Sequence, residues 1–168
     1  MGAELKNADS TNEVHLFAKV LTASDGVIAG TREDLSSVAL VETLKLSGFE
    51  VTQQRVVSDG VESVASALRE MTENFAGLIV TTGGTGFTQR DLTPEGTRKV
   101  IEREAPGLAE AMRLVNPLGR LSRGVAGIKG NSIILNTPGS TKGCVECLNA
   151  VIDVVPHALR LLNGERLH

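Results

Sequence analysis

Short apolar runs that favour strands alternate along this chain with segments whose apolar residues repeat at helical spacing. The clearest strand candidate is residues 77–82 (GLIVTT), which are short, rich in β-branched residues and followed directly by glycines. Apolar runs at 14–22 and 49–57 are also typical of buried strands, and helical spacing follows each of them, at 35–44 and 61–71. Strands that alternate with helices usually pair in parallel, so the pattern predicts an α/β fold.

Three prolines indicate how the later helices begin and end. Thr93 and Pro94 predict a helix start, with Thr93 as the N-cap and Pro94 at the first helical position. Pro106 is expected to break that helix and to restart it through Val115. Pro156 either kinks the last helix or separates two helices, and the sequence leaves both possibilities open.

A two-residue turn predicts an antiparallel element near the end of the chain. The apolar runs 125–129 and 132–136 flank Gly130 and Asn131, which is typical of a β-hairpin. We therefore expect three layers, with a mostly parallel mixed sheet, helices on both of its faces and a short antiparallel hairpin.

Length and charge narrow the protein class. A chain of 168 residues fits one domain at 14–168, preceded by a flexible polar tail at 1–13. A net charge of −3 without a basic stripe argues against nucleic-acid binding. The sequence shows neither an apolar run of roughly 18 residues nor a signal peptide, and its two cysteines form no disulfide framework. We expect a cytoplasmic protein that does not bind membranes.

Aromatic residues are scarce, with four Phe and neither Trp nor Tyr. The core must therefore be aliphatic, and a ligand site built from several stacked aromatic rings is excluded. Phe87 is the one aromatic residue in a candidate ligand loop, where it could form a wall or stack on a planar ligand.

The segment 82–95 is the strongest candidate binding loop. Ligands of open α/β sheets bind beyond the carboxyl ends of the strands, and glycines there let backbone N–H groups approach an anion. The loop matches neither the Walker A pattern nor the dinucleotide fingerprint, and a tight turn before a helix cap is the structural alternative. Its candidate binding residues are Thr82, Gly83, Gly84, Thr85, Gly86, Phe87 and Arg90, with the acid Asp91 beside them.

Three further loops follow predicted strands. Ser24 and Asp25 lie in a polar loop after the first strand. Asp59 follows the second strand, where its spacing to Glu62 also fits an ordinary capping box. The third loop precedes the last helix and could cradle an anion through Pro138, Gly139 and Ser140.

Cys144 and Cys147 form a C-x-x-C pair for which the sequence offers no second pair of zinc ligands. Because Cys144 shares an apolar helix face with Leu148, packing in the core is the preferred interpretation over a redox role.

These loops, taken together, resemble the MogA/MoaB family of molybdenum cofactor biosynthesis proteins, which includes the G domain of gephyrin. The similarity extends over nearly the whole of 14–164. The matching segments are GGTGFTQRDLTPE at 83–95, VIEREAPGL at 100–108, LSRGVAGIKG at 121–130, ILNTPGS at 134–140, TASDG at 22–26 and VVSDGVESV at 56–64.

The resemblance implies a molybdopterin-binding domain that usually forms a homotrimer. Active members use Mg-ATP to adenylate molybdopterin, which gives adenylyl-molybdopterin and pyrophosphate, and pass the product to a MoeA-type molybdotransferase. By motif, Asp59 and Asp91 match the two catalytic acids and would hold Mg²⁺ or orient the phosphates, and Ser122 joins the binding residues.

Two positions depart from the family pattern, and an alternative function stays open on a separate ground, because some family members of this length lack clear adenylation activity. The last loop reads PGST at 138–141, where the family commonly has PGNP, and Gly26 stands where a polar residue is frequent. The alternative is a non-catalytic MoaB-like paralogue that binds molybdopterin or a partner protein without adenylating it.

Overall fold

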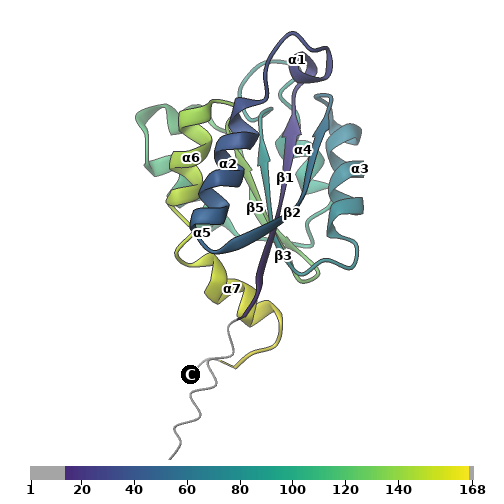
Figure 1. Ribbon diagram of the computed structural model, residues 1–168. Coiled ribbons are helices and arrows are strands. Elements are labelled where there is room, and N and C mark those ends of the chain that lie inside the picture. Colours follow the sequence, from purple (N-terminus) through teal and green to yellow (C-terminus); the bar gives the residue numbers. More distant parts are fainter. Residues whose placement is uncertain (1–13, 167–168) are drawn as a thin grey trace, which may run out of the picture.

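Six strands form one mixed sheet in the order β2-β1-β3-β6-β5-β4 (Figure 1). The computed structural model describes residues 14–166, so the predicted tail at 1–13 lies outside the described residues. Strands β2, β1, β3 and β6 are parallel, whereas β5 is antiparallel to β6 and to β4. The strands are β1 (Leu16–Ala23), β2 (Phe49–Val57), β3 (Gly77–Thr82), β4 (Arg103–Glu104), β5 (Ala126–Lys129) and β6 (Ser132–Thr137).

Helices cover both faces of this sheet (Figure 1). One face carries α2 (Leu35–Leu46), α5 (Pro106–Leu114), α6 (Thr141–Asn149) and α7 (Val155–Leu162), and the other carries α3 (Val61–Thr72) and α4 (Thr93–Arg98). A one-turn helix α1 (Asp25–Ile28) and a 3₁₀ helix η1 (Pro117–Leu121) lie in the connections. The predicted three-layer α/β fold with a mixed sheet and a hairpin is confirmed.

The alternation of side chains along the strands divides the core in two. Ala18 and Val20 of β1 pack on the side of α2 and α6, whereas Leu21 packs on the side of α3. Leu78 and Ile79 of β3 divide between the two sides in the same way, and both are fully buried. Each strand therefore supplies apolar residues to both layers, as expected for strands buried on both faces.

Two expectations for the later helices are wrong in detail. Thr93 is the first residue of α4, and Leu92 is its N-cap. The Thr93 side chain does not cap the helix, and the Thr93 N–H donates to the carbonyl of Gly84. The helix also ends at Arg98, well before Pro106, and the short strand β4 separates it from α5.

The open question at Pro156 is settled in favour of two helices. Pro156 lies in the first turn of α7, where its missing N–H costs no helical hydrogen bond, and α6 has already ended at Asn149. Among the described residues, no helix is long and apolar enough to cross a bilayer.

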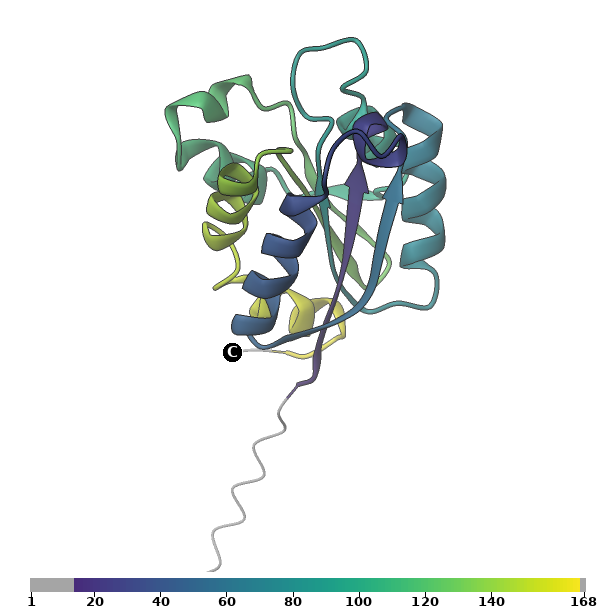
Figure 2. The same cartoon turned by 45° about the horizontal axis from the view of Figure 1, so that its top comes forward.

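The topology gathers the candidate loops at one end of the sheet. Strand β1 lies between β2 and β3, so the chain changes direction of winding beside β1. The loops after β1, β3 and β6 meet beyond the carboxyl ends of these strands (Figure 2). Such a switch point is where open α/β sheets bind ligands.

Candidate functional site

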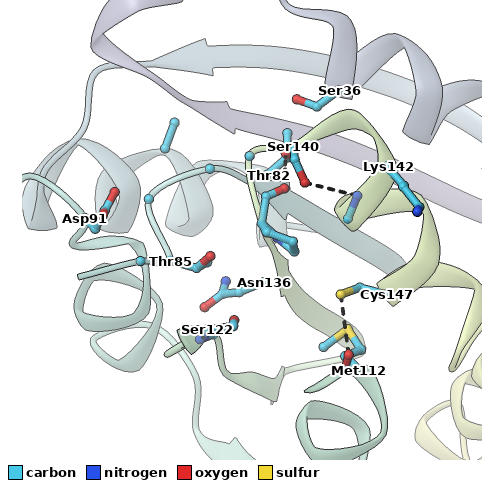
Figure 3. Close-up of a pocket in the computed structure, with 18 of the residues that line it drawn as sticks. Ser36, Thr82, Thr85, Asp91, Met112, Ser122, Asn136, Ser140, Lys142 and Cys147 are labelled. Carbon is cyan, nitrogen blue, oxygen red and sulfur yellow. Dashed lines mark hydrogen bonds between the residues drawn. The ribbon is translucent and has the colours of Figure 1, made fainter. Parts of the chain in front are cut away.

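A cavity of about 670 Å³ opens at this end of the sheet. Its volume lies within the usual range for small-molecule sites. Figure 3 shows Asp91 at one end, Met112 and Cys147 at the other, and Thr82 and Asn136 between them. The cavity is lined by twelve of the residues predicted for binding or catalysis: Ser24, Asp59, Thr82, Gly83, Gly84, Thr85, Gly86, Asp91, Ser122, Pro138, Gly139 and Ser140.

The glycine loop (residues 83–91) offers unused backbone donors to this cavity. Within residues 14–166, the amides of Gly84, Thr85 and Gly86 donate no hydrogen bond. Gly84 has φ +69°, and a side chain there would overlap the Thr93 hydroxyl and approach Asp59 Oδ1 to 3.3 Å. Consecutive free N–H groups of this kind suit an anion such as a phosphate.

Asp59 does not cap α3, so the capping-box interpretation is wrong. The N-cap of α3 is Gly60, and no side chain caps the helix. Asp59 instead exchanges hydrogen bonds with Asp25: the Asp25 N–H donates to Asp59 Oδ2 at 2.9 Å, and the Asp59 N–H donates to Asp25 Oδ1 at 3.1 Å. The loops after β1 and β2 are therefore fastened to each other through these two acids.

Arg90 joins the glycine loop to that pair. Its guanidinium donates to both carboxylate oxygens of Asp25, at 3.0 and 3.1 Å, and to the Asp59 carbonyl at 2.8 Å. The hydrogen bond from Arg90 holds the pKa of Asp25 below its usual range. Neither Asp25 nor Arg90 lines the cavity, so their predicted part in substrate binding stays a prediction.

Asp91 lines the cavity from the end of the glycine loop. Its Oδ2 accepts from the Thr88 N–H at 2.9 Å and lies 2.9 Å from where a Cβ on Gly86 would be. A side chain at position 86 would therefore force this carboxylate to shift. Phe87, the predicted aromatic wall, is 70% exposed and does not line the cavity.

The loop after β6 forms another wall of the cavity. Ser140 caps α6 through its side chain, which accepts from the Gly143 N–H. Thr82 Oγ1 donates to the carbonyl of Pro138 at 2.9 Å, and an Arg32 amino group donates to the carbonyl of Gly139 at 3.2 Å. The predicted loop residues are thus in place, although Ser140 already uses its hydroxyl oxygen within the helix cap.

One known protein family matches most of this chain. A family described as "Probable molybdopterin binding domain" matches residues 19–157. A molybdopterin adenylyltransferase of Helicobacter pylori is 40% identical over 153 residues, which are 86% of each chain. The chain belongs to the MogA/MoaB family.

A solved family structure and a longer relative agree with this assignment. The molybdopterin biosynthesis enzyme MoaB of Thermus thermophilus is 45% identical, with a TM-score of 0.83 over 91% of this chain and 99% of that one. Gephyrin of Dictyostelium discoideum is 34% identical over 97% of this chain, which corresponds to 25% of the gephyrin chain.

Two residues that line the cavity, Asn136 and Arg113, were not predicted from the sequence. Asn136 is the penultimate residue of β6 and is buried. Its side chain accepts from the Val125 N–H and donates to the hydroxyls of Thr81 and Thr97. Its position at the carboxyl end of a strand could have indicated it. Arg113, from α5, also lines the cavity, but no local pattern marks a helix residue that a distant connection brings to the site.

The two cysteines are free thiols inside the fold rather than a redox pair at its surface. Cys144 is buried in the core, and Cys147 is half-buried and lines the cavity. Burial raises the pKa of each thiol to about 11. The core-packing interpretation fits Cys144 directly.

We expect these thiols to resist alkylation in the native protein. With a pKa near 11, each thiol is deprotonated roughly 100-fold less often at pH 8 than in an unfolded chain, and only the thiolate reacts. Iodoacetamide labelling, followed by mass spectrometry, should be slow in buffer and fast in denaturant. Equal rates in the two conditions would contradict the burial seen here.

The two acids of the cavity leave oxygens free for a cation. Asp59 and Asp91 each accept a backbone hydrogen bond at Oδ2, whereas neither Oδ1 has a partner among residues 14–166. No group of three His, Cys, Asp or Glu side chains suited to a metal occurs in the described part of the chain. Mg²⁺ commonly uses one or two carboxylates together with substrate phosphates and water, so the residues present fit a magnesium ion that is also held by nucleotide phosphates.

Proposed function

We propose that this chain is a molybdopterin adenylyltransferase, which transfers the adenylyl group of Mg-ATP to molybdopterin and releases pyrophosphate. The main observation behind this proposal is the cavity at the switch point of the sheet. Three amides of the glycine loop that donate no hydrogen bond line this cavity together with two carboxylates. The family membership and the 40% identical relative named for this activity support the proposal.

The reaction needs charge neutralisation more than proton transfer. The phosphate oxygen of molybdopterin forms a bond to the α-phosphorus of ATP, and the bond from that phosphorus to the bridging oxygen breaks as pyrophosphate leaves. A phosphate nucleophile is already ionised, so no strong general base is required. Catalysis then rests on placing two polyanions in line and on compensating their charge.

The lining residues are suited to both tasks. The amides of Gly84, Thr85 and Gly86 can donate to phosphate oxygens, and the side chains of Arg32 and Lys142 line the same cavity with positive charge. Bound magnesium would be held by Asp59 and Asp91 and would withdraw charge from the phosphates.

The family resemblance also implies an oligomeric state, a cellular location and a partner protein. We expect a homotrimer in the cytoplasm that hands adenylyl-molybdopterin to a MoeA-type molybdotransferase. Analytical ultracentrifugation of the purified full chain tests the trimer.

A label-transfer experiment tests the proposed reaction against the non-catalytic alternative. The protein is incubated with molybdopterin, Mg²⁺ and ATP labelled at the α-phosphate. Label that moves to the pterin supports adenylation. Binding is followed in parallel by pterin absorbance, because a chain without Trp or Tyr absorbs little near 280 nm. Bound pterin without label transfer would support the paralogue that only binds.

Two substitutions at Asp59 separate the effect of its negative charge from that of the hydrogen bond it accepts from the Asp25 N–H. Asp59→Asn keeps an oxygen that can accept from the Asp25 N–H, whereas Asp59→Ala removes it. We expect both variants to lose most turnover, but only Asp59→Ala to lose stability, by about 1 kcal/mol. Denaturant unfolding and turnover are measured on both. A fully active Asp59→Asn would exclude a role for the charge.

A further inference from the structure

The side chain of Arg123 donates hydrogen bonds to both ends of the segment 86–91, the outer part of the glycine loop. Its Nε donates to the carbonyl of Gly86 at 2.9 Å, and Nη2 donates to the carbonyl of Asp91. Nη1 donates to the Glu95 carboxylate at 2.6 and 3.2 Å. The backbone N–H of Arg123 also donates to the carbonyl of Thr85 at 2.9 Å. One residue thus closes the turn that carries Asp91.

The rest of that turn has little else to hold it. The hydrogen bonds between Thr88 and Asp91, in both directions, lie within the turn itself. Residues 87–90 are exposed. Arg90 ties the turn to the loops after β1 and β2, but among residues 14–166 it donates no hydrogen bond to Gly86. The separation of Gly86 from Asp91, and with it the place of the Asp91 carboxylate, therefore depends on Arg123.

Arg123 acts from outside the cavity. Its neighbours Ser122 and Gly124 line the cavity, whereas Arg123 does not. Its side chain is 38% exposed, and the Glu95 carboxylate already balances its charge. Direct contact with substrate phosphates is therefore not its role in this arrangement.

We propose that Arg123 is a positioning residue that fixes the Asp91 carboxylate at the cavity, with Glu95 orienting the guanidinium. This inference rests on the catalytic role proposed for Asp91. A guanidinium suits the task because its rigid planar fork can satisfy two carbonyls and a carboxylate at once. A lysine ammonium carries the same charge but cannot span the same three acceptors in fixed geometry.

The test compares Arg123→Lys with a matched control. Arg98→Lys changes the same residue type in an exposed ion pair with Glu104, away from the cavity. We expect Arg123→Lys to lower kcat roughly 10- to 100-fold, because a displacement of about 1 Å at a reacting group can cost that much. We expect the dissociation constant for molybdopterin to change less than threefold, and Arg98→Lys to match the unmodified protein in both.

Amide hydrogen exchange provides a readout that a general loss of stability would not reproduce. In Arg123→Lys, exchange should accelerate in peptides covering 85–92 and stay unchanged in the core strand β3. Uniform acceleration over the chain, or unchanged exchange at 85–92, would overturn the positioning role.

The kinetics distinguish this inference from the proposed function. If Asp91→Asn is inactive and Arg123→Lys retains full kcat, the role of Arg123 is wrong and that of Asp91 stands. If Asp91→Asn itself retains full turnover, the role of Asp91 fails and the inference on Arg123 fails with it. A kcat loss in Arg123→Lys, with pterin affinity kept and exchange changed only at 85–92, supports the inference.

Discussion

Replacement of Asp91 by Asn is expected to lower turnover roughly 10²- to 10³-fold while molybdopterin binding is largely preserved. The change removes one negative charge from a cavity where positioning and electrostatics supply most of the catalysis, and single groups of that kind have effects of this size. The amide oxygen can still accept from the Thr88 N–H, so the turn keeps its shape. Turnover is measured by pyrophosphate release, and binding by the absorbance of the bound pterin.

The control for this variant is Asp153→Asn. Asp153 is exposed, lies between α6 and α7 and does not line the cavity, so the same chemical change should leave turnover unaffected. Normal turnover by Asp91→Asn would remove Asp91 from the mechanism. Loss of pterin binding together with turnover would instead assign Asp91 to binding.

The second large effect is expected for Gly84→Ala. A Cβ at this position would overlap the Thr93 hydroxyl, and its φ of +69° disfavours any side chain. The Thr93 hydroxyl is buried and has no hydrogen-bond partner in the described chain, so it has little space to move. We expect a loss of roughly 2–4 kcal/mol in the free energy of unfolding, from backbone strain and overpacking together, and loss of turnover.

Gly130→Ala is the matched control for strain alone. Gly130 also has a positive φ, +57°, but no atom lies within 4 Å of the Cβ it would receive. Denaturant unfolding should show a loss of about 1 kcal/mol for Gly130→Ala, with turnover unchanged. Equal losses in the two variants would mean that crowding at Gly84 contributes nothing to its effect.

Local sequence patterns predict those helices and strands that depend on neighbouring residues along the chain. The strand at 77–82 and the hairpin at Gly130 and Asn131 follow from apolar runs and turn residues, and both are confirmed. The start of α3 at Val61 was also predictable, but its cap was not. The pattern around Asp59 fits a capping box, and nothing nearby in sequence shows that the Asp25 N–H, 34 residues away, binds that carboxylate instead.

The parts of the site that sequence did not reveal depend on contacts between distant segments. Arg123 binds Gly86 across 37 residues and Asp91 across 32. Phe87 belongs to a predicted ligand loop, yet its side chain turns to solvent because the loop projects beyond the sheet. The position of a loop after a strand is therefore predictable, whereas the direction of its side chains depends on partners that only the folded chain brings close.

Release of pyrophosphate by the purified protein decides whether this chain adenylates molybdopterin. Molybdopterin and Mg-ATP are supplied together and each alone, and pyrophosphate is quantified against the pterin consumed. We expect one pyrophosphate per pterin, none with either substrate alone, and release slowed roughly 10²- to 10³-fold with Asp91→Asn. Pyrophosphate release without pterin, or bound pterin and ATP with no release by the unmodified protein, would contradict this expectation.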